Sequence, residues 1–178
     1  MKNPKMKILI IYATTEGQTR KIARFMEEQL QAEGHPVVIA EVTDAPPSPE
    51  DFDMVLIGSS IHMHQYHKAV KQYVISNLDT LNNMKSHFFS VCMAVASDIP
   101  EEHEEAAKIA SDFLEDTGWN TDTPKQFAGA LKYTQYDFFK KLIMRMIAKK
   151  EGGSTDTSQD HEYTDWGEVK KYVLGLVS

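Results

Sequence analysis

The chain has 178 residues, of which 42% are hydrophobic and 25% are charged, and these values are ordinary for one globular domain. Its 19 basic and 26 acidic residues leave a net charge of −7, which disfavours nonspecific binding to nucleic acid. No hydrophobic run approaches the roughly 18 residues of a membrane-spanning helix, and the lone cysteine, Cys92, excludes an internal disulfide. We therefore expect a cytoplasmic protein folded as a single domain over residues 1–178.

The first fifty residues predict a strand, a helix and a second strand. Residues 7–13 form a continuous hydrophobic and β-branched run, which is typical of a strand covered on both faces. Over residues 17–33 the hydrophobic side chains recur at helical spacing, and Gly34 is suited to end that helix. Residues 37–42 predict the second strand, and a stiff proline-rich loop follows at 45–49.

The same alternation continues toward the C-terminus. Short hydrophobic runs predict further strands at 54–58, 88–95 and 126–131. Helical spacing predicts helices at 66–75 and 101–117, between those strands.

A last helix is expected to begin next to Asp165. The Asp165 side chain can cap the helix, and Glu168 follows three residues later, as in a capping box. Between the fifth strand and this helix lies an insertion, approximately residues 133–163. Five strands separated by helices predict an α/β fold, a doubly wound parallel sheet with strand order 2-1-3-4-5.

The turn after the first strand is rich in donors for an anion. It runs Thr14-Thr15-Glu16-Gly17-Gln18-Thr19 and opens directly into the first helix. Hydroxyl groups and exposed backbone N–H groups at a helix N-terminus suit a phosphate monoester. The pattern is neither the nucleoside-triphosphate loop nor the dinucleotide loop. The alternative interpretation is a capped helix with no ligand.

Longer patterns carry a family resemblance. They are Gly-Gln-Thr-Arg-Lys-Ile-Ala at 17–23, Gly-Ser-Ser-Ile at 58–61 with Tyr-His at 66–67, Ala-Gly-Ala-Leu-Lys-Tyr at 128–133, Gly-Gly-Ser-Thr-Asp-Thr at 152–157 and Tyr-Thr-Asp-Trp at 163–166. Together they resemble the HemG family, the flavodoxin-like, quinone-dependent protoporphyrinogen IX dehydrogenases. The last two patterns are the most specific, since ordinary flavodoxins lack them.

The resemblance implies a flavodoxin-like fold, bound FMN and an oxidoreductase of haem biosynthesis. Its substrate would be protoporphyrinogen IX, its product protoporphyrin IX and its electron acceptor a membrane quinone. An electron-transfer flavodoxin or a general flavin-dependent quinone reductase remains open, and the insertion is the feature that separates them. A flavin-free signalling module is a third alternative, which Thr14 and Thr19 oppose because a receiver-type domain would carry clustered acids there. A homo-oligomer is also open.

The resemblance also implies three segments that hold the cofactor. The hydroxyls of Thr14 and Thr19 and the amides of the intervening turn would bind the FMN phosphate. Two further loops would flank the flavin ring. The implied residues are Thr14, Thr15, Glu16, Gly17, Gln18 and Thr19 in the first loop, Ser59, Ser60, Ile61 and His62 in the second, and Val95, Ala96, Ser97 and Asp98 in the third.

The second loop departs from the family pattern, which has Arg and Tyr where this chain has His62 and Met63. His62, His64 or Tyr66 would then have to cover the flavin, and His62 or His64 could relay protons. The spacing His62-x-His64-x-x-His67 brings at most two imidazoles together, so we expect no metal site. Cys92 lies in a hydrophobic strand and is expected to be an inert buried thiol.

The insertion contains a predicted amphipathic helix over residues 137–150. One half of the helical wheel carries Phe138, Phe139, Leu142, Ile143, Met146 and Ile147, and the other carries Lys140, Lys141 and Arg145. Residues 132–150 have a charge of +5, against −12 for the rest of the chain. A basic amphipathic helix suits an anionic membrane surface or a hydrophobic, acidic substrate. The alternative is a helix that packs on the sheet. We expect peripheral association with the inner face of the cell membrane.

Overall fold

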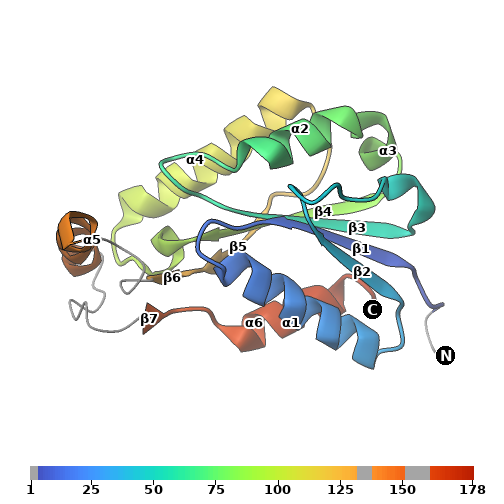
Figure 1. The fold of residues 1–178 in the computed structure, drawn as a ribbon, viewed down its shortest axis with the longest axis horizontal. Helices are drawn as coiled ribbons and strands as arrows, with labels where there is room; N and C mark the ends of the chain where they lie inside the picture. The colour runs from blue at the N-terminus through green and yellow to red at the C-terminus, as the bar shows by residue number, and fades with distance from the viewer. Residues whose placement is uncertain (1–3, 132–137, 151–160) are drawn as a thin grey trace.

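A computed structural model describes residues 4–131, 138–150 and 161–178. Its centre is a parallel sheet of five strands in the order β2-β1-β3-β4-β5, as predicted. The strands are β1 (Ile8–Ala13), β2 (Val37–Glu41), β3 (Met54–Ser60), β4 (Lys85–Cys92) and β5 (Lys125–Ala128). All five carboxyl ends point the same way, toward the left of Figure 1, so the loops that follow β1, β3 and β4 gather at one edge.

Helices cover both faces of the sheet (Figure 1). One face carries α1 (Gln18–Ala32) and α6 (Trp166–Gly175), and the other carries α2 (Lys68–Ser76), α3 (Leu78–Asn82) and α4 (Pro100–Thr117). Short 3-10 turns, η1 (Pro49–Asp51) and η2 (Met93–Ala96), complete the main layers. The short helix α3 was not predicted.

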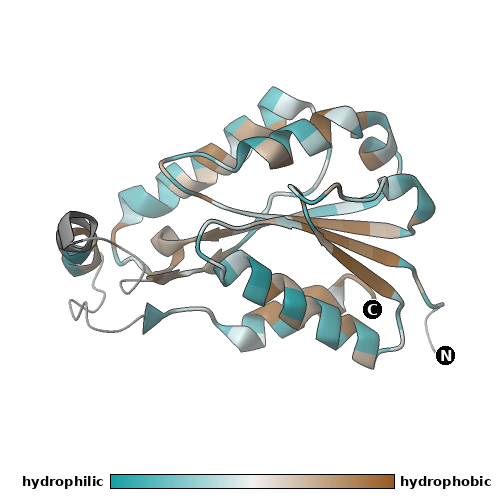
Figure 2. Cartoon of the chain, in the orientation of Figure 1, coloured by the Kyte–Doolittle hydropathy of each residue, from teal (hydrophilic) through white to brown (hydrophobic). Residues whose placement is uncertain are grey.

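Burial on both faces explains why the strands read as continuous hydrophobic runs. Every residue of β1 is buried, and this strand is coloured as hydrophobic in Figure 2. Ile8, Ile10 and Tyr12 pack in the core under α1 and α6. Leu9 and Ile11 alternate with them and pack in the core under α2 and α4.

The insertion lies beyond the carboxyl ends of the strands. There β6 (Ala130–Leu131) pairs antiparallel with β7 (His161–Glu162), and α5 (Phe138–Lys150) lies next to them (Figure 1). Met144 and Ala148 of α5 pack against Leu131. The predicted helix is thus confirmed, and it stands at the edge where a doubly wound sheet binds its ligands.

Three predicted boundaries are wrong. The sequence predicts the fourth strand at 88–95, whereas β4 is Lys85–Cys92. Its hydrogen-bonded pairing with β3 starts with Lys85 opposite Met54 and ends with Val91 opposite Ser60. The hydrophobic residues beyond it form η2 instead of strand. The run 126–131 splits at Gly129, after which the chain leaves the parallel sheet to pair with β7. Helix α2 begins at Lys68, because the His67 side chain caps it by accepting a hydrogen bond from the amide of Ala69.

Candidate functional site

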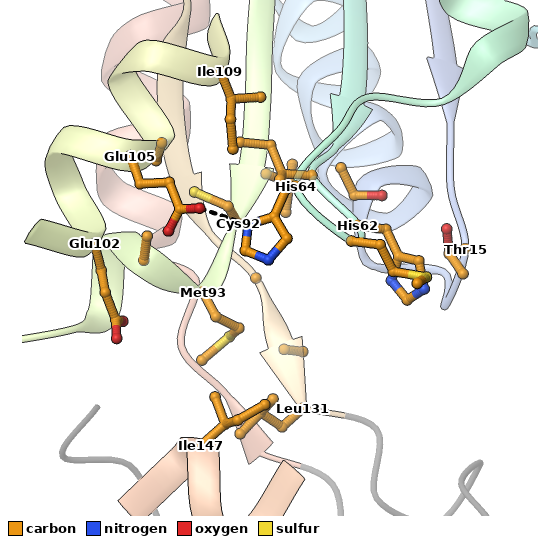
Figure 3. Close-up of a pocket in the computed structure, with 18 of the residues that line it drawn as sticks. Thr15, His62, His64, Cys92, Met93, Glu102, Glu105, Ile109, Leu131 and Ile147 are labelled. Carbon is orange, nitrogen blue, oxygen red and sulfur yellow. Dashed lines mark ion pairs between the residues drawn. The ribbon is translucent and has the colours of Figure 1, made fainter. Parts of the chain in front are cut away.

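A cavity of about 790 Å³ opens at the carboxyl ends of the strands. It extends from the turn after β1, past the loop after β3, to η2, α4 and the insertion. Figure 3 shows Thr15 and His62 on one side of this space and Met93, Leu131 and Ile147 on another. Its volume is within the range of small-molecule and cofactor sites.

The turn between β1 and α1 is built as a cradle. Gly17 is the N-cap of α1 with φ of 95°, a left-handed conformation that glycine adopts without strain. Its amide donates to Thr14 Oγ1 at 2.8 Å, which leaves the Thr14 hydroxyl hydrogen for another acceptor. A Cβ at Gly17 would meet no atom within 4 Å, so the space over this turn is open.

Two buried polar atoms at the first turn of α1 have no hydrogen-bond partner in the part of the chain that the structure describes. They are Thr19 Oγ1 and Gln18 Oε1, and their residues are 1% and 5% exposed. A buried hydroxyl without a partner costs free energy, roughly 1–3 kcal/mol. Together with the amides of the helix N-terminus, Thr19 fits an anionic ligand that completes the turn. Glu16 and Thr15 line the cavity beside this turn.

The second predicted loop forms a tight turn at the rim of the cavity. The backbone of His62 exchanges hydrogen bonds with that of Gln65, at 2.9 and 3.2 Å. Met63 and His64 between them have φ of 50° and 63°, which side chains other than glycine seldom adopt. The His64 Nδ1 atom lies 2.6 Å from the Glu105 carboxylate (Figure 3), so the turn contacts α4 through a pair of exposed side chains.

Ser60, Ile61 and His62 line the cavity, whereas Ser59 does not. Ser59 is fully buried, and its hydroxyl accepts a hydrogen bond from the amide of His67 at 3.2 Å. It therefore supports the loop from behind. The histidines of this loop also diverge, because His67 caps α2 while His64 turns to α4.

The suggestion that Tyr66 could cover the flavin is wrong. Tyr66 is buried, with its ring 4.9 Å from that of Phe88 and 5.1 Å from that of Phe113. Its hydroxyl donates to Ser90 Oγ at 2.9 Å. Burial raises the pKa of this phenol far above its usual value, although the Ser90 hydrogen bond opposes the change. The aromatic ring belongs to the core.

The third predicted loop, Val95 to Asp98, contributes no lining residue to the cavity. Met93, Ala94 and Ile99 take that place, because β4 ends three residues earlier than predicted. Ser97 is buried and its hydroxyl accepts from the amide of Ile99 at 3.1 Å, before the start of α4. The sequence prediction also missed the acidic wall of the cavity, which consists of Glu101, Glu102 and Glu105 on α4.

Helix α5 closes the far end of the cavity with Met144, Ile147 and Lys150. Lys150 Nζ lies 3.5 Å from Glu102 Oε1, so an ion pair joins α5 to α4. On the predicted hydrophobic face Met146 is 68% and Ile147 is 39% exposed, whereas Ala148, which the prediction did not include, is buried. The side chains of residues 138–143, which include the rest of that face, and the pattern at 152–157 lie outside the described residues.

Comparison with known proteins agrees with this architecture. Residues 9–158 match the family model described as the flavodoxin domain, so the chain is a flavodoxin-domain protein. Flavodoxin 1 of Bacillus cereus superposes with a TM-score of 0.59 at 14% identity, over 96% of this chain and 97% of that one, and supports the fold.

Relatives with higher sequence identity show to which family of flavodoxin-domain proteins the chain belongs. The chain is 35% identical over 169 residues to the protoporphyrinogen IX dehydrogenase [quinone] of Escherichia coli K12, covering 94% of this chain and 93% of the relative. It is 31% identical over 177 residues to a Leishmania major protein of the same name, covering 97% and 75%. The chain belongs to the protoporphyrinogen IX dehydrogenase [quinone] family, as the sequence patterns predicted.

Proposed function

We propose that this chain binds FMN and oxidises protoporphyrinogen IX to protoporphyrin IX, with the electrons passed to a membrane quinone. The observation that carries the proposal is the buried Thr19 hydroxyl without a partner in the described residues, at the N-terminus of α1. The phosphate of FMN supplies the acceptor that this hydroxyl, the Thr14 hydroxyl and the adjacent amides lack. The flavin, when bound, accepts the two electrons that each oxidation step removes from the porphyrinogen.

The cavity supports a second, larger ligand beside the flavin. It continues from the turn after β1 to α5, with an apolar floor of Met93, Ile99 and Leu131. A hydrophobic tetrapyrrole fits such a floor. Its pyrrole N–H groups are donors that suit the carboxylates of α4, and its propionates suit Lys150.

The histidines of the second loop are the candidates for proton transfer. His62 and His64 both line the cavity, and imidazole is the side chain that most often transfers protons in enzyme sites. The contact with Glu105 orients the His64 ring, whereas His62 faces the ligand space beside Thr15 (Figure 3).

The outer face of α5 supports contact with an anionic membrane, where the quinone is dissolved. Met146 is 68% and Ile147 is 39% exposed, and the neighbouring Arg145 and Lys149 are exposed too. Each basic residue near an anionic surface contributes about 1 kcal/mol of attraction. None of the helices in the described part of the chain is long and hydrophobic enough to cross a bilayer. We infer peripheral contact through α5, at the inner face of the cell membrane.

The reaction is tested in two halves. The purified protein should carry FMN, and anaerobic protoporphyrinogen IX should bleach the flavin absorbance. A menaquinone analogue should then restore it. If the loaded protein is not reduced by porphyrinogen but exchanges electrons with other donors, the chain is a carrier or a general quinone reductase. If it binds no FMN, the proposal fails entirely.

Membrane contact is tested by charge reversal. The double variant Arg145→Glu, Lys149→Glu should lose co-sedimentation with vesicles that contain anionic lipid, because the outer face of α5 would then repel them. The control is Lys170→Glu, Lys171→Glu, the same change in charge at exposed positions of α6. Equal loss of binding in both double variants would reduce the effect to net charge and refute a role for α5.

A further inference from the structure

The Tyr-Thr-Asp-Trp pattern near the C-terminus contacts the turn that opens α1. Gln18 Nε2 donates to Thr164 Oγ1 at 2.9 Å, across 146 positions of sequence. Thr164 Oγ1 in turn donates to the carbonyl of Ala128, at the end of β5, at 2.7 Å. Neighbouring Glu162 pairs with Lys21 of α1 and accepts a hydrogen bond from Trp166 Nε1 at 2.8 Å. The pattern thus joins α1 to the end of the sheet beside the cavity.

These contacts determine which way the Gln18 amide points. A hydroxyl has one hydrogen, and Thr164 gives its hydrogen to the Ala128 carbonyl, so toward Gln18 it can only accept. The Glu162 carboxylate is a second acceptor for the Gln18 amide. Burial acts to raise the pKa of Glu162, but hydrogen bonds from Lys21, Trp166 and Gln18 bring it below its ordinary value. Both acceptors require the amide nitrogen, so the Gln18 oxygen must face elsewhere.

The Gln18 oxygen therefore needs a donor that the described residues do not provide. It is buried without a partner, and Gln18 lines the cavity. A phosphate oxygen cannot serve, because phosphate near neutral pH presents acceptors to the protein. A hydroxyl group can. In FMN the sugar-alcohol chain, which joins the phosphate to the ring, carries such hydroxyls.

We propose that Gln18 Oε1 accepts a hydrogen bond from a hydroxyl of the flavin's sugar-alcohol chain, and that Thr164 is the positioning residue that holds the amide in this orientation. The inference rests on the proposed binding of FMN. It assigns the C-terminal pattern a role in cofactor affinity, through Thr164. In this arrangement Gln18 does not bind the phosphate. The neighbouring Thr19 hydroxyl and the N-terminus of α1 bind it instead.

The test compares Thr164→Val with Thr164→Ser for three ligands: FMN, riboflavin, which lacks the phosphate, and lumiflavin, which lacks the whole sugar-alcohol chain. Valine keeps the shape of threonine but cannot accept from Gln18. We expect Kd for both FMN and riboflavin to rise about five- to tenfold in Thr164→Val. Thr164→Ser should bind like the parent protein, and Kd for lumiflavin should not change in either variant.

Folding is checked by thermal unfolding without ligand, against Thr121→Val. Thr121 donates to the Ser86 carbonyl at 2.7 Å, the same kind of bond at the opposite end of the sheet, so this control loses stability without losing affinity. Weaker binding of FMN alone in Thr164→Val would mean that Gln18 faces the phosphate and would overturn the inference. Unchanged affinity for all three ligands, or weaker binding of lumiflavin as well, would overturn it too. A parent protein that binds neither FMN nor riboflavin would instead refute the proposed function.

Discussion

Replacing Thr19 with valine should change stability and cofactor affinity in opposite directions. Thr19 is 1% exposed and its hydroxyl has no partner among the described residues, so the protein without ligand bears the cost of desolvating that group. Valine has nearly the same shape and a similar helix propensity, and it removes the hydroxyl. We expect the ligand-free variant to be more stable by about 1 kcal/mol, which raises Tm by roughly 2–4 °C in a chain of this size.

The FMN complex should respond in the opposite sense. A hydrogen bond to a charged group contributes about 1.5–3 kcal/mol, so its loss should raise Kd for FMN about 10- to 150-fold. Quenching of FMN fluorescence measures Kd, and thermal unfolding without flavin measures stability. Riboflavin, which has no phosphate, should bind the variant and the parent protein equally.

Thr117→Val is the matched control. The Thr117 hydroxyl is also buried but donates to the Phe113 carbonyl at 2.8 Å in α4. Its removal should cost about 1 kcal/mol of stability and leave FMN affinity unchanged. The reasoning about Thr19 is refuted if Thr19→Val destabilises the ligand-free protein as Thr117→Val does and binds FMN as tightly as the parent.

Three further predictions concern the frame of the site. Gly58→Ala should lower the free energy of unfolding by about 3 kcal/mol in urea, because the new Cβ would lie 2.0 Å from a ring carbon of Phe89, and Phe89→Leu should partly restore it. Glu162→Gln should make the free energy of unfolding depend less on pH in the acid range. The pKa of Glu162 is lowered in the folded protein, so this carboxylate stabilises the fold fully above its ordinary pKa of 4.5, and the stabilisation is lost as the pH falls through the lower, folded pKa. An unchanged dependence on pH would contradict this. Asp165→Ala removes the acceptor for the Glu168 amide at 3.1 Å and should lower the free energy of unfolding by about 1 kcal/mol. Unchanged stability in urea would contradict the role of Asp165 as the cap of α6.

The sequence alone determined the order of the elements and the edge of the sheet at which the cavity lies. Strand β1 and the turn after it could be predicted because their signals are local: an unbroken hydrophobic run, then hydroxyls and a glycine at a helix start. The cap of α6 by Asp165 was predicted for the same reason, and its hydrogen bond is present. The family patterns could be read directly because they consist of neighbouring residues.

Only the tertiary structure decided where strands end and which distant groups meet. Residues 93–96 are hydrophobic enough for a strand, but the β3–β4 ladder ends before them, so Met93 and Ala94 line the cavity in place of Val95–Asp98. From the sequence, the Tyr66 ring could equally stack on a flavin or pack in the core. In the structure it packs against Phe88 and Phe113 in the core. The bond from Gln18 to Thr164 has no local signal at all. It exists because the first helix and the last helix pack side by side on the same face of the sheet.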